Sequence, residues 1–200
     1  MNIDRFDKVK GFMPFHEGEA LFNWASFFSK YGSILEIGTY CGKSALLLAE
    51  GAKANDQIIF TVDHHRGSEE HQINEEYFDE EIFDSSINEI NSLPLLIENI
   101  NNYKGHNIVP IIRESSIAAR DWDSPLAMVF IDGSHSLESA MQDFLSWSSK
   151  IISGGALVIH DIYENPEEGG QAPFHVYKHA LKNGFVDFER EDTIVCLKKS

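Results

Sequence analysis

The sequence predicts an α/β fold in which helices cover both faces of a mostly parallel β-sheet, and two patterns support this prediction. Five short apolar runs alternate along the chain with segments of helical periodicity. The runs are almost continuously apolar, as is typical of strands that are buried on both faces of a parallel sheet. Two further runs near the carboxyl terminus flank a short charged turn, which indicates an antiparallel hairpin at the edge of the sheet.

Most of the predicted strands are rich in aliphatic and β-branched residues and end at a polar residue or a glycine. In chain order they are Ser33–Gly38, Gln57–Asp63, Asn107–Arg113, Leu126–Asp132, Ala156–Asp161, Phe185–Phe188 and Thr193–Leu197. Together they predict a Rossmann-like, doubly wound, mostly parallel seven-stranded sheet with an antiparallel C-terminal hairpin.

Four helices are predicted from runs rich in Leu and Ala or from apolar residues spaced three and four apart. They are Ser44–Ala54, Leu93–Lys104, Ser136–Lys150 and Pro173–Asn183. Gly154 and Gly155 are expected to end the unit that contains the third helix, and Gly184 is expected at the C-cap of the fourth. The apolar segment Phe12–Phe28 is expected to pack on the sheet or on a second subunit, so a homo-oligomer is one expectation.

Composition limits the classes of partner. The 200 residues fit one domain, 1–200, without internal repeats or a low-complexity linker. Asp and Glu total 32 against 16 Lys and Arg, and the formal net charge of −16 disfavours nucleic acid and anionic membranes as partners. No apolar run approaches the roughly 20 residues that span a bilayer. The amino terminus lacks the apolar core of a signal peptide and Cys41 and Cys196 are too few for a disulfide framework, so a cytoplasmic location is expected.

An acidic insertion at about residues 65–92 interrupts the alternation of strands and helices. The stretch between Gly67 and Tyr103 contains ten acidic residues and no Lys or Arg. Two interpretations stay open: a solvated acidic segment, and a lid over the active site, since long insertions in compact domains are often functional. In both cases Phe78, Ile82 and Phe83 are expected to face the rest of the domain.

Polar residues end or follow five of the predicted strands. The carboxyl ends of parallel strands meet at one rim of the sheet, which is where ligands bind in such folds. The segments are Glu36-Ile37-Gly38, Asp63-His64-His65, Arg113-Glu114-Ser115-Ser116, Asp132-Gly133-Ser134-His135 and His160-Asp161. A module for acidic protein–protein interaction would not need polar groups at five strand ends, so the rim predicts a small-molecule site instead.

The loop Glu36–Ser44 joins the first strand to its helix and contains two glycines. Its end, Gly-Lys-Ser, suggests a phosphate-binding P-loop, but only three residues separate Gly38 from Gly42 where that motif needs four. A dinucleotide fingerprint, G-x-G-x-x-G, does not fit either. The pattern E-x-G-x-x-x-G, with an acid at the end of the next strand, resembles class I S-adenosylmethionine-dependent methyltransferases, and E-I-G-T-Y-C-G-K-S is similar in particular to their catechol O-methyltransferase branch.

This resemblance implies S-adenosylmethionine as the cofactor. The two loop glycines would let the backbone approach it closely, Glu36 would attract its ammonium group directly or through water, and the helix N-terminus would attract its carboxylate. Asp63 can accept two hydrogen bonds from a ribose diol, and Ser115 or Ser116 lies where such folds contact the adenine edge. The predicted cofactor-binding residues are Glu36, Gly38, Thr39, Tyr40, Gly42, Ser44, Asp63, His64, Ser115, Ser116 and Asp132.

A second pair of motifs, Phe130–Ser136 (FIDGSHS) and Gly154–Asp161 (GGALVIHD), is similar to a bacterial group that includes sugar and natural-product O-methyltransferases. The resemblance covers about residues 14–198. Catechol-type relatives bind magnesium through two aspartates and an asparagine; both aspartates have counterparts here, but Ile162 stands at the asparagine position. The candidate metal ligands are Asp132, His160 and Asp161. This set of two carboxylates and an imidazole would suit manganese, iron or zinc better than magnesium, and a site with a divalent metal and one without are both left open.

His135 lies three residues after Asp132, where catechol-type relatives carry a lysine base. An unperturbed imidazole, with a pKa of about 6.5, can take a hydroxyl proton at neutral pH. The alternative for His135 is a structural role at the start of a helix. The predicted catalytic residues are therefore His135 and Asp132, and the predicted function is O-methylation of a small hydroxylated acceptor. A non-catalytic S-adenosylmethionine-binding subunit of the same fold is the alternative.

Overall fold

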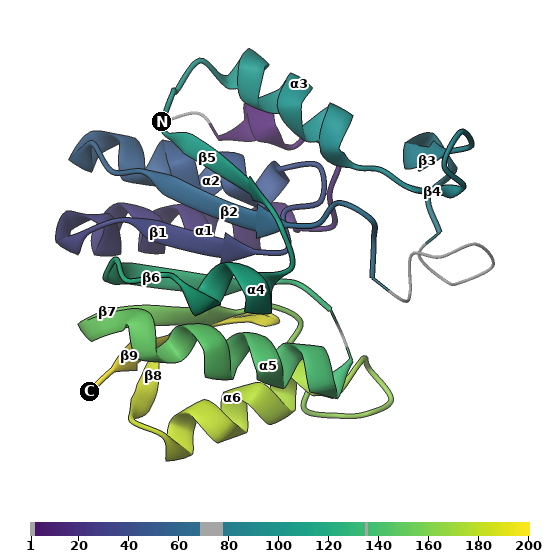
Figure 1. Ribbon diagram of the computed structural model, residues 1–200. Helices are drawn as coiled ribbons and strands as arrows, with labels where there is room; N and C mark the ends of the chain where they lie inside the picture. Colours follow the sequence, from purple (N-terminus) through teal and green to yellow (C-terminus); the bar gives the residue numbers. More distant parts are fainter. Residues whose placement is uncertain (1–2, 69–77, 135) are drawn as a thin grey trace.

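The chain forms a seven-stranded sheet with helices on both faces (Figure 1). The computed structural model describes residues 3–68, 78–134 and 136–200. The strands of the main sheet are β1 (Ile34–Ile37), β2 (Ile59–Asp63), β5 (Ile108–Ile112), β6 (Leu126–Ile131), β7 (Ile151–Ile159), β8 (Phe185–Glu191) and β9 (Ile194–Lys199). A separate two-stranded sheet consists of β3 (Phe83–Asp84) and β4 (Glu89–Ile90).

The strand order β5-β2-β1-β6-β7-β9-β8 places the first strand in the middle of the sheet. β5, β2, β1, β6 and β7 are parallel, whereas β9 pairs antiparallel with both β7 and β8. The chain winds outward from β1 to β5, returns to β6 beside β1, and then winds to the opposite edge. The predicted doubly wound sheet with its antiparallel hairpin is therefore confirmed, and its switch point lies between β1 and β6.

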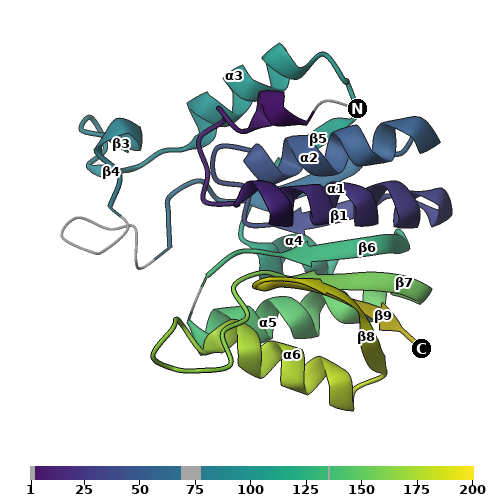
Figure 2. The ribbon, with the colours of Figure 1, turned by 180° about the vertical axis from the view of Figure 1, so that it is seen from behind.

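The helices form one layer on each face of the sheet. They are α1 (Phe15–Phe28), α2 (Lys43–Ala52), α3 (Leu93–Tyr103), α4 (Ser115–Arg120), α5 (Leu137–Trp147) and α6 (Ala172–Lys182). Figure 1 views the face covered by α4, α5 and α6, and Figure 2 views the opposite face, covered by α1 and α2. Among the described residues no helix combines the length and the apolar character needed to cross a bilayer.

The central strands are buried because both of their faces meet a helical layer. All six residues of β6 are buried, which agrees with the apolar run that predicted this strand. Side chains alternate along a strand, so Ile34 of β1 belongs to the core under α1 and α2, while Leu35 belongs to the core under α4, α5 and α6. The segment Phe12–Phe28 packs through α1 on this sheet, in agreement with one of the two expectations for it, and contact with a second subunit stays a prediction.

The predicted elements differ from the structure in several places. Gly154 and Gly155 do not end the preceding unit but lie inside β7, which starts at Ile151 because that residue already pairs with Leu126 of β6. The register shifts between Leu126 and Met128, where β7 has extra residues between Ile151 and Ala156, and pairing is regular from Ala156 onward. The short helix α4 and the β3–β4 hairpin were not predicted, since neither is long enough to show a periodic pattern.

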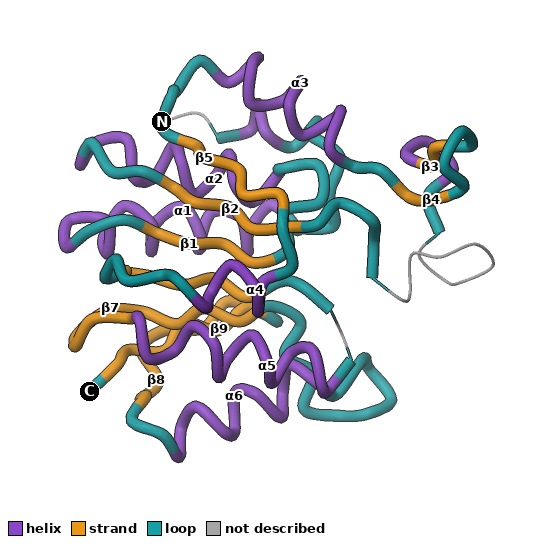
Figure 3. The backbone as a smooth tube through the Cα atoms, in the orientation of Figure 1, coloured by secondary structure: helices purple, strands orange, loops and turns teal. Residues whose placement is uncertain are grey.

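Residues 69–77 of the acidic insertion lie outside the described residues. The structure describes the insertion up to residue 68 and again from residue 78 onward. Figure 1 shows β3 and β4 set apart from the main sheet, and Figure 3 shows loops leading to them. Ile82 and Ile90 are buried against Cys41, with Phe78 and Phe83 packed on the same cluster. Thus Phe78, Ile82 and Phe83 face the domain, as predicted, and the role of the insertion as a lid stays a prediction.

Gly38, directly after β1, is expected to be irreplaceable because its backbone touches the end of β6. A Cβ at this position would lie 2.0 Å from the carbonyl oxygen of Asp132, and its φ is +86°. Gly38→Ala should lower the free energy of unfolding by about 3 kcal/mol or more, measured by urea denaturation. Gly184→Ala is the matched control, because Gly184 has φ +85° with no atom within 4 Å, so only backbone strain of about 1–2 kcal/mol is expected. Equal losses in the two variants would contradict the close approach.

Candidate active site

The carboxyl ends of the parallel strands surround two adjoining cavities. The first, of about 340 Å³, is lined by residues 10–14, the loop after β1, the end of β7 and the β8–β9 turn. The second, of about 500 Å³, is lined by the ends of β2, β5 and β6 and by the first turns of α4 and α5. Both cavities are lined by Gly38, Tyr40, Asp132 and Gly133, so they meet at the switch point of the sheet.

Most of the residues predicted to bind a cofactor are brought together in these cavities. Those that line one or both are Gly38, Thr39, Tyr40, Ser44, Asp63, His64, Ser115, Ser116 and Asp132. Glu36 and Gly42 line neither: Glu36 has no exposed surface, and Gly42 is the N-cap of α2. The expected attraction of a cofactor ammonium group by Glu36, directly or through water, stays a prediction. His135 lies outside the described residues, beside Ser134, which lines the second cavity.

Asp63 at the end of β2 holds the glycine loop in place. Its Oδ2 accepts hydrogen bonds from the backbone N–H groups of Thr39 and Tyr40, both at 2.9 Å. Its Oδ1 accepts a third from the N–H of His65 at 2.7 Å. An ionised carboxylate has about four acceptor positions, so Asp63 keeps little capacity for the two ribose hydrogen bonds that the sequence suggested. The side chain still lines the second cavity.

Glu36 lies beneath the same loop in a buried polar network. The Thr61 hydroxyl donates to Oε2 of Glu36, and the hydroxyls of Thr61 and Thr39 contact each other. Among the described residues Oε1 of Glu36 has no hydrogen-bond partner. Burial raises the pKa of Glu36 to about 8, and the carboxylates of Asp132 and Asp63 also favour its neutral form. At neutral pH this group is therefore mostly a carboxylic acid and not an anion.

The second cavity is acidic. Its lining includes one arginine, Arg113, and the five acidic residues Asp63, Glu114, Asp132, Glu138 and Asp143. Burial raises the pKa of Asp143 to about 6, so this group is partly protonated near neutral pH. Ser115, the predicted adenine contact, already has one hydrogen-bond partner within the protein. Its Oγ accepts a hydrogen bond of 2.8 Å from the indole N–H of Trp147. A cation, or a ligand with hydroxyl and amino donors, fits this wall better than an anion.

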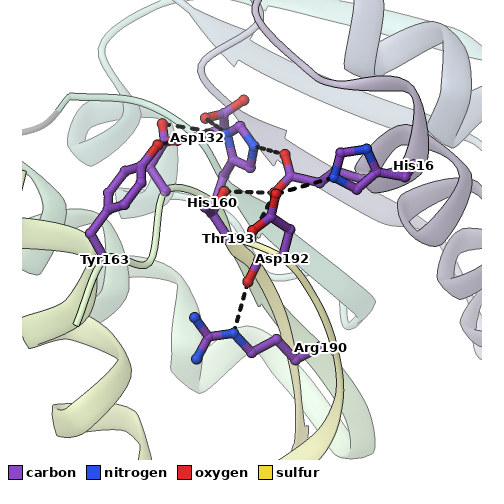
Figure 4. A network of polar contacts seen from close by, with 9 residues as sticks. His16, Asp132, His160, Tyr163, Arg190, Asp192 and Thr193 are labelled. Carbon is purple, nitrogen blue, oxygen red and sulfur yellow. Dashed lines mark hydrogen bonds and ion pairs between the residues drawn. The ribbon is translucent and has the colours of Figure 1, made fainter. Parts of the chain in front are cut away.

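His160, at the end of β7, lies between three carboxylates (Figure 4). Its Nε2 is 2.8 Å from Oε2 of Glu17, and its Nδ1 is 3.0 Å from Oδ1 of Asp132 and 3.4 Å from Oδ2 of Asp161. Burial alone would lower the pKa of His160. The charge of Asp132 and the hydrogen bonds to Asp132 and Glu17 outweigh burial and raise this pKa well above its usual value.

The three candidate metal ligands, Asp132, His160 and Asp161, are brought together as predicted. One ligand atom of each lies within 4.8 Å of the others. Two ligands about 2.1 Å from one ion lie about 3.0 Å apart at right angles and about 3.4 Å apart at a tetrahedral angle. The separations of 3.0 and 3.4 Å from His160 Nδ1 match these values, so the donor set fits a divalent ion. Ile162 is buried and apolar and offers no ligand atom, in agreement with the sequence.

Glu17 and Thr193 belong to this site but were not predicted from the sequence. Oε1 of Glu17 accepts hydrogen bonds from the Thr193 N–H at 2.8 Å and from its hydroxyl at 2.6 Å. One signal was present: Glu17 lies four residues before the buried Leu21, on the stripe that continues through Trp24 and Phe28. An acid on the buried face of a helix predicts a buried partner. The partner itself has no local signature.

Residues that line the first cavity also contact the acidic insertion. The Tyr40 hydroxyl donates to Oδ2 of Asp79 at 2.5 Å, and Lys10 Nζ lies 2.5 Å from both Asp79 and Glu81. The ring of Phe12 packs on that of Tyr40 with 5.5 Å between centroids. Tyr40 itself has φ +50°, a backbone conformation that non-glycine residues rarely adopt. The described part of the insertion therefore contacts two residues that line this cavity, Lys10 and Tyr40.

Comparison with known proteins gives the family. A family model described as a methyltransferase domain matches residues 35–162, which is more than half of the chain. The matched segment runs from β1 to just beyond β7, so it includes the glycine loop, the acid that ends β2 and the Asp132–His160 region.

Solved structures show the same fold. The O-methyltransferase NovP superimposes with a TM-score of 0.67 at 15% identity, over 92% of this chain and 80% of NovP. The O-methyltransferase TomG from Streptomyces achromogenes, involved in tomaymycin synthesis and solved with S-adenosylmethionine, gives 0.62 at 15% identity, over 98% of this chain and 85% of TomG. An rRNA methylase from Streptococcus thermophilus gives 0.59 at 10% identity, over 94% and 99% of the two chains. At these identities the likeness shows the fold, not the acceptor.

The neutral state of Glu36 predicts a pH dependence of stability. Between its unfolded pKa of 4.5 and its folded value of about 8, the folded chain keeps a proton that the unfolded chain loses. This contribution to stability therefore falls as pH rises through that range, by about 1.4 kcal/mol per pH unit. Glu36→Gln lacks the titration, so relative to wild type it should gain about 2–3 kcal/mol between pH 5 and pH 7.5 in urea denaturation. Glu19→Gln, an exposed change on α1, is the control; the same difference for Glu36→Gln at both pH values would contradict a neutral buried Glu36.

Proposed function

The chain belongs to the methyltransferase-domain family, and from this premise we propose that it transfers the methyl group of S-adenosylmethionine to a hydroxyl oxygen of a small acceptor. The family match confirms the enzyme class predicted from the sequence. The O-methyltransferases NovP and TomG, which share the fold, support oxygen as the atom that is methylated.

The observation that supports this proposal most is that Asp132 lines both cavities. S-adenosylmethionine supplies a methyl group that is activated by a positively charged sulfur. The acidic second cavity complements the charge of that molecule, and both cavities have volumes in the range of small-molecule sites. A ligand that extends from the second cavity into the first would pass Gly38 and Asp132, where an acceptor in the first cavity would meet it.

The first cavity offers what the acceptor half of the reaction needs. Methyl transfer requires acceptor, methyl carbon and sulfur in line and little water nearby. The side chains of Phe12, Met13, Tyr40 and Tyr163 line this cavity and provide an apolar wall. A small acceptor also agrees with the net charge of −16, which disfavours an RNA acceptor even though an rRNA methylase shares the fold.

Proton removal is assigned to the segment after β6. His135 is proposed as the general base from its sequence position, and Asp132 as the group that orients the acceptor hydroxyl beside it. The strongly raised pKa of His160 makes that imidazole a poor base, because it already holds its protons between Glu17 and Asp132. His135 is therefore preferred to His160 for the role.

Calorimetry with S-adenosylmethionine and turnover with a panel of hydroxylated small molecules test the proposal. Binding is expected, and S-adenosylhomocysteine should form with at least one acceptor. Asp63→Ala should weaken binding roughly 5- to 150-fold, because it removes the anchor of the glycine loop and any ribose contact. Glu19→Gln on α1 should bind as wild type. No heat and no thermal stabilisation at millimolar ligand would contradict the proposal, and binding without turnover across the panel would favour a non-catalytic binding subunit.

We further propose that Asp132, His160 and Asp161 hold a divalent metal ion that binds the acceptor oxygen. The mixed donor set of two carboxylates and an imidazole suits manganese, iron or zinc better than magnesium. The imidazole must lose the proton on Nδ1 to become a ligand, so metal uptake should release protons. The ion would supply a positive charge beside the acceptor oxygen.

Metal analysis of protein stripped with a chelator and then reloaded with Mn²⁺ or Zn²⁺ tests this site. About one equivalent is expected for wild type, and Asp132→Ala and Asp161→Ala should each lose it because each removes one of three ligands. Asp192→Ala is the control, since Asp192 lines the same cavity but lies in the β8–β9 turn. Wild-type metal content in both ligand variants would place the ion elsewhere.

A further inference from the structure

Glu17 is a buried carboxylate that the proposed reaction does not use. It lies in the first turn of α1 and is 1% exposed. Burial of an ionised carboxylate costs free energy unless hydrogen bonds and opposite charge compensate for it. The hydrogen bonds with His160 and Thr193 lower the pKa of Glu17 despite its burial, so it is an anion. The two carboxylate oxygens of Glu17 have different hydrogen-bond partners, Thr193 on Oε1 and His160 on Oε2.

Oε1 is occupied by Thr193, whose backbone N–H and hydroxyl both donate to it. Oε2 remains for the Nε2 of His160 at 2.8 Å. An ionised carboxylate only accepts hydrogen bonds, so Nε2 must carry a hydrogen and donate it. The other ring nitrogen, Nδ1, is then left facing Asp132 and Asp161.

We propose that Glu17 is a positioning residue that fixes the ring of His160, with Nε2–H donated to α1 and Nδ1 directed at Asp132 and Asp161. The inference builds on the metal site proposed above, because Nδ1 is the atom that this orientation leaves available for an ion. Carboxylates that accept the second N–H of a histidine ligand fix its tautomer and increase its basicity. The helix α1 thereby takes part in the site, although it lies outside the matched family segment.

Glu17→Gln tests the inference with almost no change in size. The Thr193 N–H can only donate, so it requires the amide oxygen of the glutamine on its side. The amide NH₂ group then faces Nε2 of His160, which must accept and therefore loses its hydrogen. The ring then keeps only the hydrogen on Nδ1, where it blocks a metal, whereas in wild type an ion can displace that hydrogen while Nε2 keeps its own. The variant thus removes the hydrogen from Nε2 without removing a single ligand.

His16→Ala is the matched control. His16 precedes Glu17 on α1, and Asp192 precedes Thr193 in the β8–β9 turn. The Nε2 of His16 lies 3.2 Å from Oδ2 of Asp192 (Figure 4). The control therefore removes a neighbouring contact between the same two elements and leaves His160 untouched. A purely structural role for this junction would affect both variants alike.

Two measurements on the full chain decide the matter. Long-range ¹H–¹⁵N correlations of metal-free protein should show hydrogen on both ring nitrogens of His160 in wild type and His16→Ala, and on Nδ1 alone in Glu17→Gln. Titration with Mn²⁺ or Zn²⁺ against a competing chelator should show a Kd about 10- to 100-fold higher for Glu17→Gln and unchanged for His16→Ala. Hydrogen that stays on Nε2 in Glu17→Gln, or an unchanged Kd in a chain that binds the ion, would overturn the inference.

The two proposals can fail separately. Wild-type protein that binds no ion would end the metal proposal, while the hydrogen on Nε2 in metal-free wild type and Glu17→Gln would still decide the role of Glu17. Should Glu17→Gln fail to fold, the ¹⁵N shifts of wild-type His160 with Zn²⁺ identify the ligating nitrogen. Ligation through Nδ1 supports the inference, and ligation through Nε2 overturns it.

Discussion

The glycine loop after β1 lies directly against the backbone of Asp132, and the geometry of both cavities depends on this contact. Parallel pairing of β1 with β6 brings the two strand ends together, and a side chain at residue 38 would collide with the carbonyl of Asp132. Asp63 secures the other side of the loop through the N–H groups of Thr39 and Tyr40. Because Asp132 lines both cavities, a shift of the loop would alter both of them at once.

Two titratable groups are buried next to this contact, and they meet the cost of burial in opposite ways. Glu36 has no cationic partner among the residues that the structure describes, and burial raises its pKa to about 8, so it avoids charge by holding a proton. His160 is surrounded by carboxylates, so its pKa rises and it becomes the cation that they need. One network is thus nearly neutral beneath the loop, whereas the other concentrates charge at the end of β7.

The charged network joins distant parts of the chain. Glu17 comes from the first helix, His160 from β7 and Thr193 from the turn before the last strand. Hydrogen bonds in a buried, low-dielectric setting are strong when every partner is satisfied and costly when one is missing. The packing of α1 on the sheet is therefore coupled to the chemistry at the strand ends, and not only to the stability of the core.

The sequence by itself determined most strands of the main sheet, the loop at the switch point and the family of the protein. Local apolar runs specify β1 and β6 because these central strands are buried on both faces, and similar runs specify β2 and the more exposed edge strand β5. The glycine spacing specifies the loop because only glycine permits the close approach at residue 38. Most of the predicted cofactor-binding residues consequently line the two cavities. These features depend on neighbours along the chain, so they leave local patterns.

Only the tertiary structure decided what individual polar groups do. Asp63 is engaged by the loop, Glu36 is sealed beneath it, and Glu17 holds His160 although the two are 143 positions apart. The same applies to Gly154, which continues β7 because Ile151 already pairs with β6. Hydrogen-bond partners and pKa values are set by which side chains the fold packs together in a low-dielectric interior. Contacts between such distant residues have no periodicity or spacing that a sequence could display.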